Sequence, residues 1–253
     1  MTGLVLLDKP SGVTSFEALG ALKRALGSGH VGHAGTLDRF ATGLLVALTG
    51  RLTRLAEVVS GLDKVYRAVL RFGEETDTLD PEGQVVDRRP LPDPEALRGA
   101  LAFFRGQIEQ CPPAYSAVHV GGRRAYALAR EGRPPELPPR PVTIHSLEIL
   151  RLELPEVELQ VRCSKGTYVR SLARDLARRA GSCAHLTALR RLSIGPFRVE
   201  QAVAPEQFRP ERDLLNPSRF LPELPGLCCL TLRAPCVSSV RQGRPMRDDF
   251  AAR

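Results

Sequence analysis

The most restrictive feature of this sequence is the irregular order in which strand-like and helix-like segments follow one another. Apolar runs typical of strands occupy residues 3–7 and 65–72, and two alternating runs occupy 142–152 and 157–163. Helix-like segments lie between them without the strand–helix–strand rhythm of a doubly wound parallel sheet. The order therefore predicts an α+β fold.

Four segments have the residue spacing of helices. Thr14 and Glu17 fit a capping box, and apolar residues at helical spacing predict one helix that ends at Gly27 (Phe16, Leu19, Leu22 and Leu26). An amphipathic helix opened by Pro94 is expected over 93–104. Further helices are expected over 124–130 and 167–180, and a short one after the glycine-rich, irregular segment 29–43.

The chain has 253 residues, enough for one large domain, or for one domain with a small appendage. The proline-rich segment 205–225 is a candidate boundary. Residues 226–253 are too few to form an independent domain.

The net charge of +8 rests almost entirely on arginine, which supplies 32 of the 36 Lys and Arg residues. Arginine forms bidentate contacts with phosphate and stacks on bases, so a polyanionic partner is one interpretation. A codon preference of a GC-rich genome explains the same composition, so charge alone leaves the question open.

The six cysteines form no CxxC pair and no framework spacing, which predicts reduced, mostly buried thiols in a cytoplasmic protein (Cys111, Cys163, Cys183, Cys228, Cys229 and Cys236).

The N-terminal residues do not have the pattern of a signal peptide, and no run approaches 18 apolar residues, so no membrane association is expected. The GxGxxG match at 27–32 follows a helix instead of a strand, so no nucleotide cofactor is expected. The histidines do not form an HExxH motif, and no metal site is expected.

The segment 32–45, GHAGTLDRFATGLL, contains the strongest candidate for chemistry. It places one carboxylate, Asp38, in a glycine-rich loop five residues after His33. Such a carboxylate can act as a nucleophile or a base, although a loop aspartate is more often a turn residue or a helix cap.

This segment resembles the signature of the TruB family of pseudouridine synthases, and other motifs agree in the same order. The N-terminal GLVLLDKPSGVTS, the KVY at 64–66 and the PPAYSA at 112–117 resemble family motifs. So do CSKGTYVRSL at 163–172 and LRR at 189–191 followed by GPF at 195–197. The resemblance covers roughly residues 3–200, and several long motifs in order are far more specific than one.

The resemblance implies a pseudouridine synthase fold, in which a mixed, mainly antiparallel sheet is flanked by helices. Residues 1–203 would form the catalytic domain, with a thumb-like, RNA-gripping insertion at 110–140. Residues 204–253 would form a linker and a short or truncated segment of the PUA type, which VRQGRP at 240–245 resembles in part.

The implied activity is isomerisation of uridine to pseudouridine at position 55, in the T-arm loop of tRNA. The uracil leaves the sugar at N1 and rejoins it through C5, so no electrons are gained or lost and no cofactor is expected. The protein would act as a cytoplasmic monomer without a protein partner.

The resemblance also implies roles for single residues. Asp38 would be the catalytic carboxylate, Tyr66 would stack on the base and could take the C5 proton, and Arg170 would pair with Asp38. Six further residues would bind or position the substrate: Lys9, His33, Arg124, Arg130, Tyr168 and Leu189. Burial raises the pKa of an aspartate, whereas a neighbouring arginine lowers it by roughly 1–3 units, so a charge partner for Asp38 makes physical sense.

Three residues depart from the family pattern, namely Ala34, Arg39 and His119, where threonine, proline and lysine are usual. Two readings compete with a standalone tRNA enzyme. One is an RNA-binding or tRNA-folding module without catalysis, which the retained Asp38, Tyr66 and Arg170 disfavour. The other is the related guide-RNA-dependent enzyme, which the insertion at 110–140 and the short C-terminus disfavour.

Overall fold

The computed structural model describes residues 1–27, 29–227 and 231–244. The chain divides into two compact units, Met1–Leu214 and Leu215–Arg253. Four residues of the sequence patterns lie outside the described residues: Ser28 of the GxGxxG match, Cys228, Cys229, and Pro245 of the PUA-like segment.

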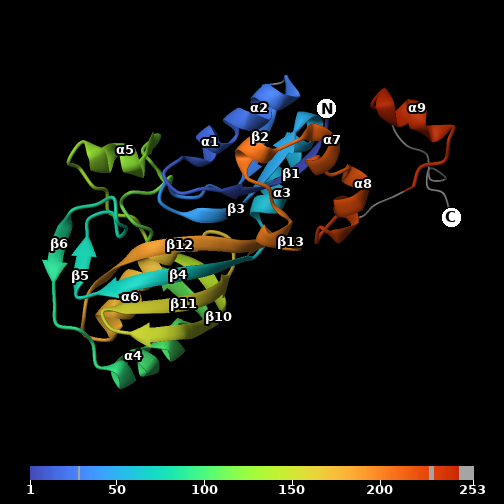
Figure 1. Ribbon diagram of the computed structural model, residues 1–253. Helices are drawn as coiled ribbons and strands as arrows, with labels where there is room; N and C mark the ends of the chain where they lie inside the picture. Colours follow the sequence, from blue (N-terminus) through green and yellow to red (C-terminus); the bar gives the residue numbers. More distant parts are fainter. Residues whose placement is uncertain (28, 228–230, 245–253) are drawn as a thin grey trace. The chain divides into compact units, whose positions relative to one another are not determined.

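The first unit is built on a nine-stranded sheet, which Figure 1 shows flanked by helices. Along its main path the order is β1 (Gly3–Lys9), β3 (Thr42–Thr49), β12 (Ala184–Ile194), β4 (Lys64–Phe72), β11 (Glu156–Cys163), β10 (Arg140–Glu153) and β7 (Gly106–Gln110). Two more strands pair outside this path, β2 (Val31–Ala34) with β3 and β13 (Phe197–Arg198) with β12. All described neighbours are antiparallel except β3 and β12. The α+β class and the mixed, mainly antiparallel sheet are confirmed.

The parallel contact between β3 and β12 is short, because only Arg190–Thr42 and Arg191–Gly43 are paired across it. We call this contact the β3–β12 joint. It divides the sheet into a β1–β3–β2 part and a part that runs from β12 to β7. The β1–β3–β2 part has a small apolar cluster of its own, while the segment before β3 contributes Leu37, Phe40 and Ala41 to the larger cluster on the other part.

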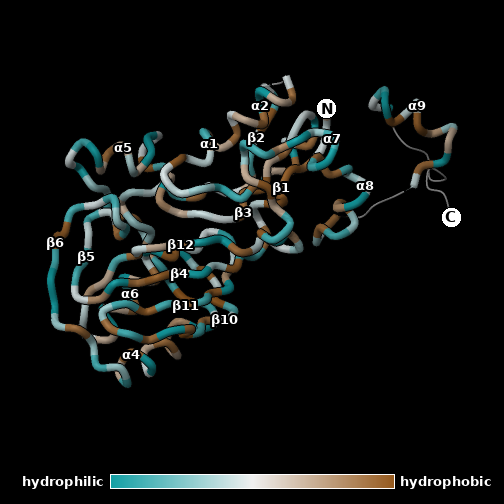
Figure 2. The backbone as a smooth tube through the Cα atoms, viewed as in Figure 1, coloured by the Kyte–Doolittle hydropathy of each residue, from teal (hydrophilic) through white to brown (hydrophobic). Residues whose placement is uncertain are grey.

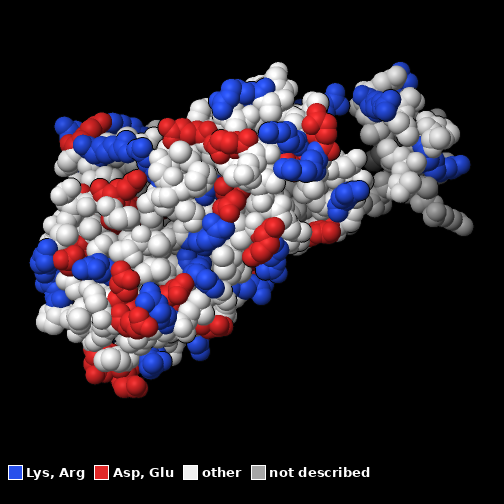
Figure 3. Space-filling view, in the orientation of Figure 1, with Lys and Arg blue, Asp and Glu red and all other residues white. Residues whose placement is uncertain are grey.

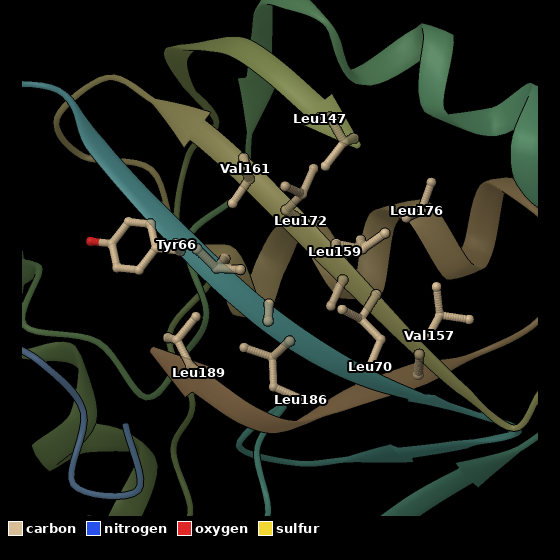
Figure 4. Packing of buried hydrophobic residues seen from close by; sticks show 14 of the residues in the cluster. Tyr66, Leu70, Leu147, Val157, Leu159, Val161, Leu172, Leu176, Leu186 and Leu189 are labelled. Atoms are coloured by element: carbon tan, nitrogen blue, oxygen red, sulfur yellow. The ribbon is translucent and has the colours of Figure 1, made fainter. Parts of the chain in front are cut away.

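The larger cluster lies between strands β4, β11 and β12 and helix α6 (Val169–Arg179), with α4 (Pro94–Ala100) beside it. Its leucines and valines alternate along the strands, so one face of the sheet carries the core. Figure 4 shows this packing, with Leu172 and Leu176 of α6 against the strand residues.

The N-terminal helix was expected to be continuous, and this prediction is wrong. The capping box of Thr14 and Glu17 is present, but α1 (Ser15–Ala18) ends after one turn and α2 (Gly20–Leu26) follows. Phe16 was placed on the apolar face, yet it is 68% exposed. Instead Ser15 points inward, where its hydroxyl bonds both the N–H and the carbonyl of Leu37. The end at Gly27, with φ 57°, is as expected.

Other segments also differ from expectation. The segment after Gly43 is strand β3 instead of a short helix, because it is a continuous apolar run buried on both faces. The glycine-rich segment 29–43 contains β2. The expected helix over 93–104 is α4 followed by a 3₁₀ turn, Leu101–Phe104. Strand β12 was recognised only as a motif, not as a strand.

The insertion is the connection between the paired strands β7 and β10, residues 111–139. It carries the ribbon of β8 (His119–Val120) and β9 (Arg123–Arg124), followed by α5 (Ala125–Arg130). Three buried residues, Val118, Ala125 and Leu137, form its small core. Figure 2 shows that the chain around α5 is largely hydrophilic.

The remaining described elements are short. A second ribbon joins β5 (Glu74–Thr76) to β6 (Val85–Arg88), and α3 (Ala56–Ser60) and α7 (Pro210–Asp213) complete the helices of the first unit. The second unit contains α8 (Pro217–Phe220) and α9 (Cys236–Arg241). None of the described helices is long and apolar enough to cross a bilayer. Among the described cysteines, Cys163 and Cys183 are buried, Cys236 is partly exposed and Cys111 is exposed; all four are free thiols.

Candidate active site

Asp38 lies in the loop between β2 and β3, where its neighbours Leu37, Phe40 and Ala41 belong to the larger apolar cluster. Glycines allow the turns of this segment, since Gly35 has a φ of 85° and Gly43 a φ of 101°. Ser15 fixes the backbone of Leu37, and the Asp38 carbonyl accepts a hydrogen bond from the Ala41 N–H at 3.2 Å. The Asp38 side chain stays 36% exposed, so the loop presents a carboxylate that a ligand can reach.

Arg170, the second residue of α6, lies directly against Asp38. Its Nε is 2.9 Å from Asp38 Oδ2, and its Nη2 donates to Asp38 Oδ1 at 3.1 Å, so the contact is bidentate. The Arg170 side chain is only 5% exposed. The ion pair spans the two parts of the sheet, because Asp38 follows β2 and α6 packs on β12 and β4.

Asp80 is a second carboxylate at this guanidinium, and sequence reasoning did not identify it. Its Oδ2 lies 3.3 Å from Arg170 Nη1, and its Oδ1 accepts hydrogen bonds from the Thr78 hydroxyl and the Glu82 N–H. Its neighbour Leu79 has a φ of 63°, a strained backbone conformation for leucine. An aspartate in the polar turn 73–83 has no sequence signal that links it to a helix 90 residues later.

The pKa of Asp38 is raised above its ordinary value, chiefly by burial. Arg170 opposes this by lowering the pKa of Asp38, and the negative charge of Asp80 raises it. The expectation that an arginine partner lowers the pKa of the aspartate is therefore correct as one contribution, but burial outweighs it. A carboxylate with a raised pKa is a stronger base and nucleophile once it is ionised.

Tyr66 lies on β4, across the β3–β12 joint from the Asp38 loop, and it is 9% exposed. Figure 4 shows its ring at one end of the apolar cluster, with the hydroxyl directed away from the leucines. Burial raises the pKa of the Tyr66 hydroxyl, whereas Arg191 lowers it through its charge and a hydrogen bond. Leu189 of β12 belongs to the same cluster and is 7% exposed.

Lys9 is completely buried at the end of β1. Its ammonium donates to the carbonyls of Pro10 and Val13 at 2.9 and 2.8 Å, and to that of Arg39 at 3.3 Å. Burial lowers the pKa of Lys9 to about 8, while the charge of Asp38 raises it. Lys9 thus binds the backbone beside Asp38 instead of projecting toward a ligand.

His33 and Tyr168 lie at two other places around the loop. His33 is on β2, and its Nδ1 is buried without a hydrogen-bond partner in the described structure. Burial, with Arg191, lowers the pKa of His33, so the neutral ring is favoured. Tyr168 directly precedes α6 and packs against the small core of the insertion.

Gln110 ties this turn to the insertion. Its amide pairs with both the N–H and the carbonyl of Tyr168, at 2.8 and 3.1 Å.

Arg124 and Arg130 are exposed on the insertion, apart from the buried charges. Arg124 donates to the carbonyl of Ala117 at 2.6 Å, and Arg130 lies over the ring of Tyr126 at 5.7 Å. Figure 3 shows Lys and Arg side chains gathered over the α5 segment. The insertion also contacts the Asp38–Arg170 pair directly, because the Tyr115 carbonyl accepts a hydrogen bond from Arg170 Nη2 at 3.0 Å.

Two further observations concern the surroundings of Asp38 and possible metal ligands. A separate hollow of about 490 Å³ includes Lys9 in its lining but none of Asp38, Tyr66 and Arg170. Within the described residues, His, Cys, Asp and Glu side chains form no group of three that could hold a metal ion.

Comparison with known proteins decides the family. The model of the TruB family pseudouridylate synthase N-terminal domain matches residues 23–169. The chain belongs to the TruB family of pseudouridylate synthases. "tRNA pseudouridine synthase B" of Bordetella avium (strain 197N) is 46% identical over 230 residues, which cover 89% of this chain and 94% of that protein. The protein of the same name from Syntrophobacter fumaroxidans is 49% identical over 208 residues, 81% of this chain and 68% of its own length.

Solved structures agree on the fold of this TruB-family chain. A chain in the "Crystal Structure of a Cbf5-Nop10-Gar1 Complex" has a TM-score of 0.61 at 27% identity. The match covers 80% of this chain and 52% of that one, so the present chain spans about half the length of that protein. The expected pseudouridine synthase fold is confirmed.

Proposed function

We propose that this TruB-family protein converts uridine to pseudouridine at position 55 in the T-arm loop of tRNA, with Asp38 as the catalytic carboxylate. The observation that carries the proposal is the Asp38–Arg170–Asp80 array, in which a reachable Asp38 meets a buried arginine, with Tyr66 beside it, in a chain related to tRNA pseudouridine synthases. The reaction moves the sugar from N1 to C5 of the same base. It therefore needs a group that attacks the substrate and a group that receives a proton, but no electron carrier.

Asp38 suits the first role because its carboxylate is reachable and its pKa is raised. Arg170 holds both carboxylate oxygens, which fixes the direction in which Asp38 can act. Asp80 in turn holds Arg170 from its other side, so the guanidinium cannot turn away from Asp38.

Tyr66 suits contact with the base. Its ring lies at the end of the apolar cluster beside Leu189, and stacking on an aromatic ring contributes roughly 1–3 kcal/mol per base. This offsets part of the few kcal/mol that flipping a base out of a folded loop costs. His33 would contact the flipped nucleotide, Tyr168 would line its pocket, and Lys9 would hold the loop that carries Asp38.

The insertion suits contact with the RNA backbone. Arg124 and Arg130 are exposed, and the arginines of this segment remain charged at all physiological pH values. We propose that they contact phosphates of the T arm, and that the protein acts in the cytoplasm as a monomer without a cofactor.

The test uses a tRNA transcript with tritium at C5 of its uridines, incubated with purified protein and no added cofactor. We expect wild type to release tritium and Asp38→Asn to release none while it still binds tRNA. Release by Asp38→Asn would remove Asp38 from the catalytic role. Absence of release from wild type, with tRNA bound, would favour an RNA-binding module instead of an enzyme. A transcript in which uridine 55 is replaced by cytidine tests the position, and gel filtration with light scattering tests the monomer.

A further inference from the structure

Arg191 is a buried cation in this site that the family motifs did not single out. It is 1% exposed, and no carboxylate of the described residues lies within ion-pair distance of it. An unpaired buried charge is costly unless hydrogen bonds satisfy it. The hydrogen-bond partners of Arg191 therefore indicate its role.

The partners of Arg191 are backbone carbonyls of the loop that carries Asp38 and of strand β3, which follows it. Its Nε donates to Leu44 at 2.7 Å, its Nη2 to Gly35 at 3.0 Å and its Nη1 to Thr36 at 3.4 Å. These carbonyls lie on both sides of Asp38 in the sequence. The planar guanidinium thus clamps both ends of the catalytic loop, which a point-like ammonium cannot do.

Arg191 also lies beside Tyr66 on the neighbouring strand. In the sheet register Arg191 is the partner of Tyr66 on β4 and of Gly43 on β3. Its guanidinium is near enough to the Tyr66 hydroxyl to lower the pKa of that group. A Cβ on Gly43 would lie 2.3 Å from the Arg191 carbonyl oxygen, so the two backbones approach as closely as glycine permits.

This placement matters because Asp38 and Tyr66 belong to different parts of the sheet. The backbone pairing of β3 with β12 consists of two residue pairs, and Arg191 is in one of them. A small shift of the Asp38 loop relative to β12 would change the distance between Asp38 and Tyr66. Misplacement of a reacting group by about 1 Å can reduce a rate by about 100-fold.

We propose that Arg191 is a positioning residue that sets the spacing of the Asp38 loop and the Tyr66 hydroxyl across the β3–β12 joint. The inference rests on the proposed isomerase activity. It concerns the rate of the chemical step, because Arg191 is buried and is not placed to contact the tRNA backbone.

Arg190 offers a matched control. It is the other paired residue of the joint on β12, and its side chain also crosses the joint, where it holds Asp8 of β1 at 3.0 and 2.7 Å. Its other side-chain partner is the Thr42 hydroxyl at 3.5 Å, and within the described residues it forms no hydrogen bond with residues 35–38 or with the Tyr66 side chain. Arg190→Lys therefore weakens the joint without releasing the catalytic loop.

The experiment measures tritium release in single turnovers with enzyme in excess over tRNA. Under these conditions the amplitude reports the fraction of active protein, while the rate constant reports the bound complex. For Arg191→Lys we expect a rate constant about 10- to 100-fold below wild type, with unchanged tRNA affinity. For Arg190→Lys we expect a wild-type rate constant. Arg191→Gln, which keeps one donor, serves as a second variant if Arg191→Lys gives little folded protein.

A spectroscopic readout separates positioning from folding. The chain has four tyrosines, so the ring signals of isotope-labelled protein can be followed by NMR, and Tyr66→Phe identifies the Tyr66 signal. Asp38 and Cys163 also act on this hydroxyl, and both remain in the variant. In Arg191→Gln, which removes the positive charge, we expect the midpoint of the Tyr66 titration to move upward, because the charge of Arg191 lowers the pKa of Tyr66.

Each outcome decides the inference. Equal decreases of the rate constant in Arg190→Lys and Arg191→Lys would mean that Arg191 only stabilises the joint, and they would overturn the proposal. A wild-type rate constant for Arg191→Lys would do the same. An inactive wild type would instead contradict the isomerase activity itself, so the two failures are distinguishable.

Discussion

The buried site and the insertion both depend on arginine, but they use it in opposite ways. Arg170 and Arg191 are 5% and 1% exposed, and each has several fixed partners. Arg124 and Arg130 of the insertion are exposed, and they make few contacts with the protein. The comparison separates arginines that hold the protein's own groups in place from arginines free to meet a polyanion.

The effect of removing an arginine on stability and on catalysis depends on whether that arginine is buried or exposed. In the buried site, truncation leaves carboxylates and carbonyls without their partner, which costs stability as well as chemistry. On the insertion, water replaces the lost contact and salt screens the charge, so the fold is hardly affected.

The largest effect is expected for Arg170→Met. The change leaves Asp38 and Asp80 facing each other without a cation, so we expect tritium release to fall by more than about 1,000-fold in rate. Breaking a buried ion pair from one side also lowers the free energy of unfolding by about 3–5 kcal/mol. Single-turnover release and urea denaturation measure the two effects.

Arg124→Met is the control for the insertion, and it should leave the free energy of unfolding within about 0.5 kcal/mol of wild type. If Arg170→Met were no less stable than Arg124→Met, the ion pairs of Arg170 would be too weak to support the buried arrangement.

The next effect concerns pH. Burial raises the pKa of Asp38, and the ionised carboxylate is the active form. The single-turnover rate should therefore fall as pH decreases, tenfold per unit below the pKa of Asp38, with a midpoint above 3.8, the ordinary value. The proposed phosphate contacts of the insertion do not involve the Asp38 carboxylate, so we expect tRNA affinity to change much less. A pH–rate profile at saturating tRNA with parallel binding measurements tests this, and a midpoint at or below 3.8 would contradict it.

The two regions also differ in how well the sequence predicts them. The motif around Asp38, the strand of Tyr66 and the helix of Arg170 could each be assigned from local patterns, because glycines, alternation and helical spacing are local signals. The meeting of Asp80 with Arg170 could not, because it depends on how a polar turn packs against a helix 90 residues later. The sequence shows Arg191 only as part of the LRR motif. Its hydrogen-bond partners are backbone carbonyls, which every residue has, so the sequence does not reveal them.

The break in the N-terminal helix has a similar origin. Helical spacing alone favours a continuous helix through Leu19 with Phe16 inside. The structure instead uses Ser15 to hold Leu37 beside the catalytic loop, and Phe16 turns outward. A long-range contact outweighed the local preference here, as it did for the strand after Gly43.

A smaller effect is expected for the double variant Arg124→Ala and Arg130→Ala. If each arginine contacts one phosphate, the slope of log affinity against log salt should decrease by about 1 per arginine removed. At low salt the tRNA affinity should fall, whereas the rate at saturating tRNA should stay near wild type. Filter binding over a salt series, with single-turnover rates at saturation, measures both quantities. A fall in the saturated rate would mean that the insertion also positions the reacting base.

The smallest effect is expected for Arg123→Ala, on the same surface. The Arg123 guanidinium already pairs with the Glu131 carboxylate, and both groups are exposed. Part of its charge is therefore neutralised before RNA arrives, so its loss should weaken tRNA binding less than Arg124→Ala does. The reciprocal variant Glu131→Gln should strengthen binding slightly, because it frees Arg123. Equal losses for Arg123→Ala and Arg124→Ala in one salt series would mean that RNA displaces Glu131. Exposure alone would then decide which arginines of the insertion contact the polyanion.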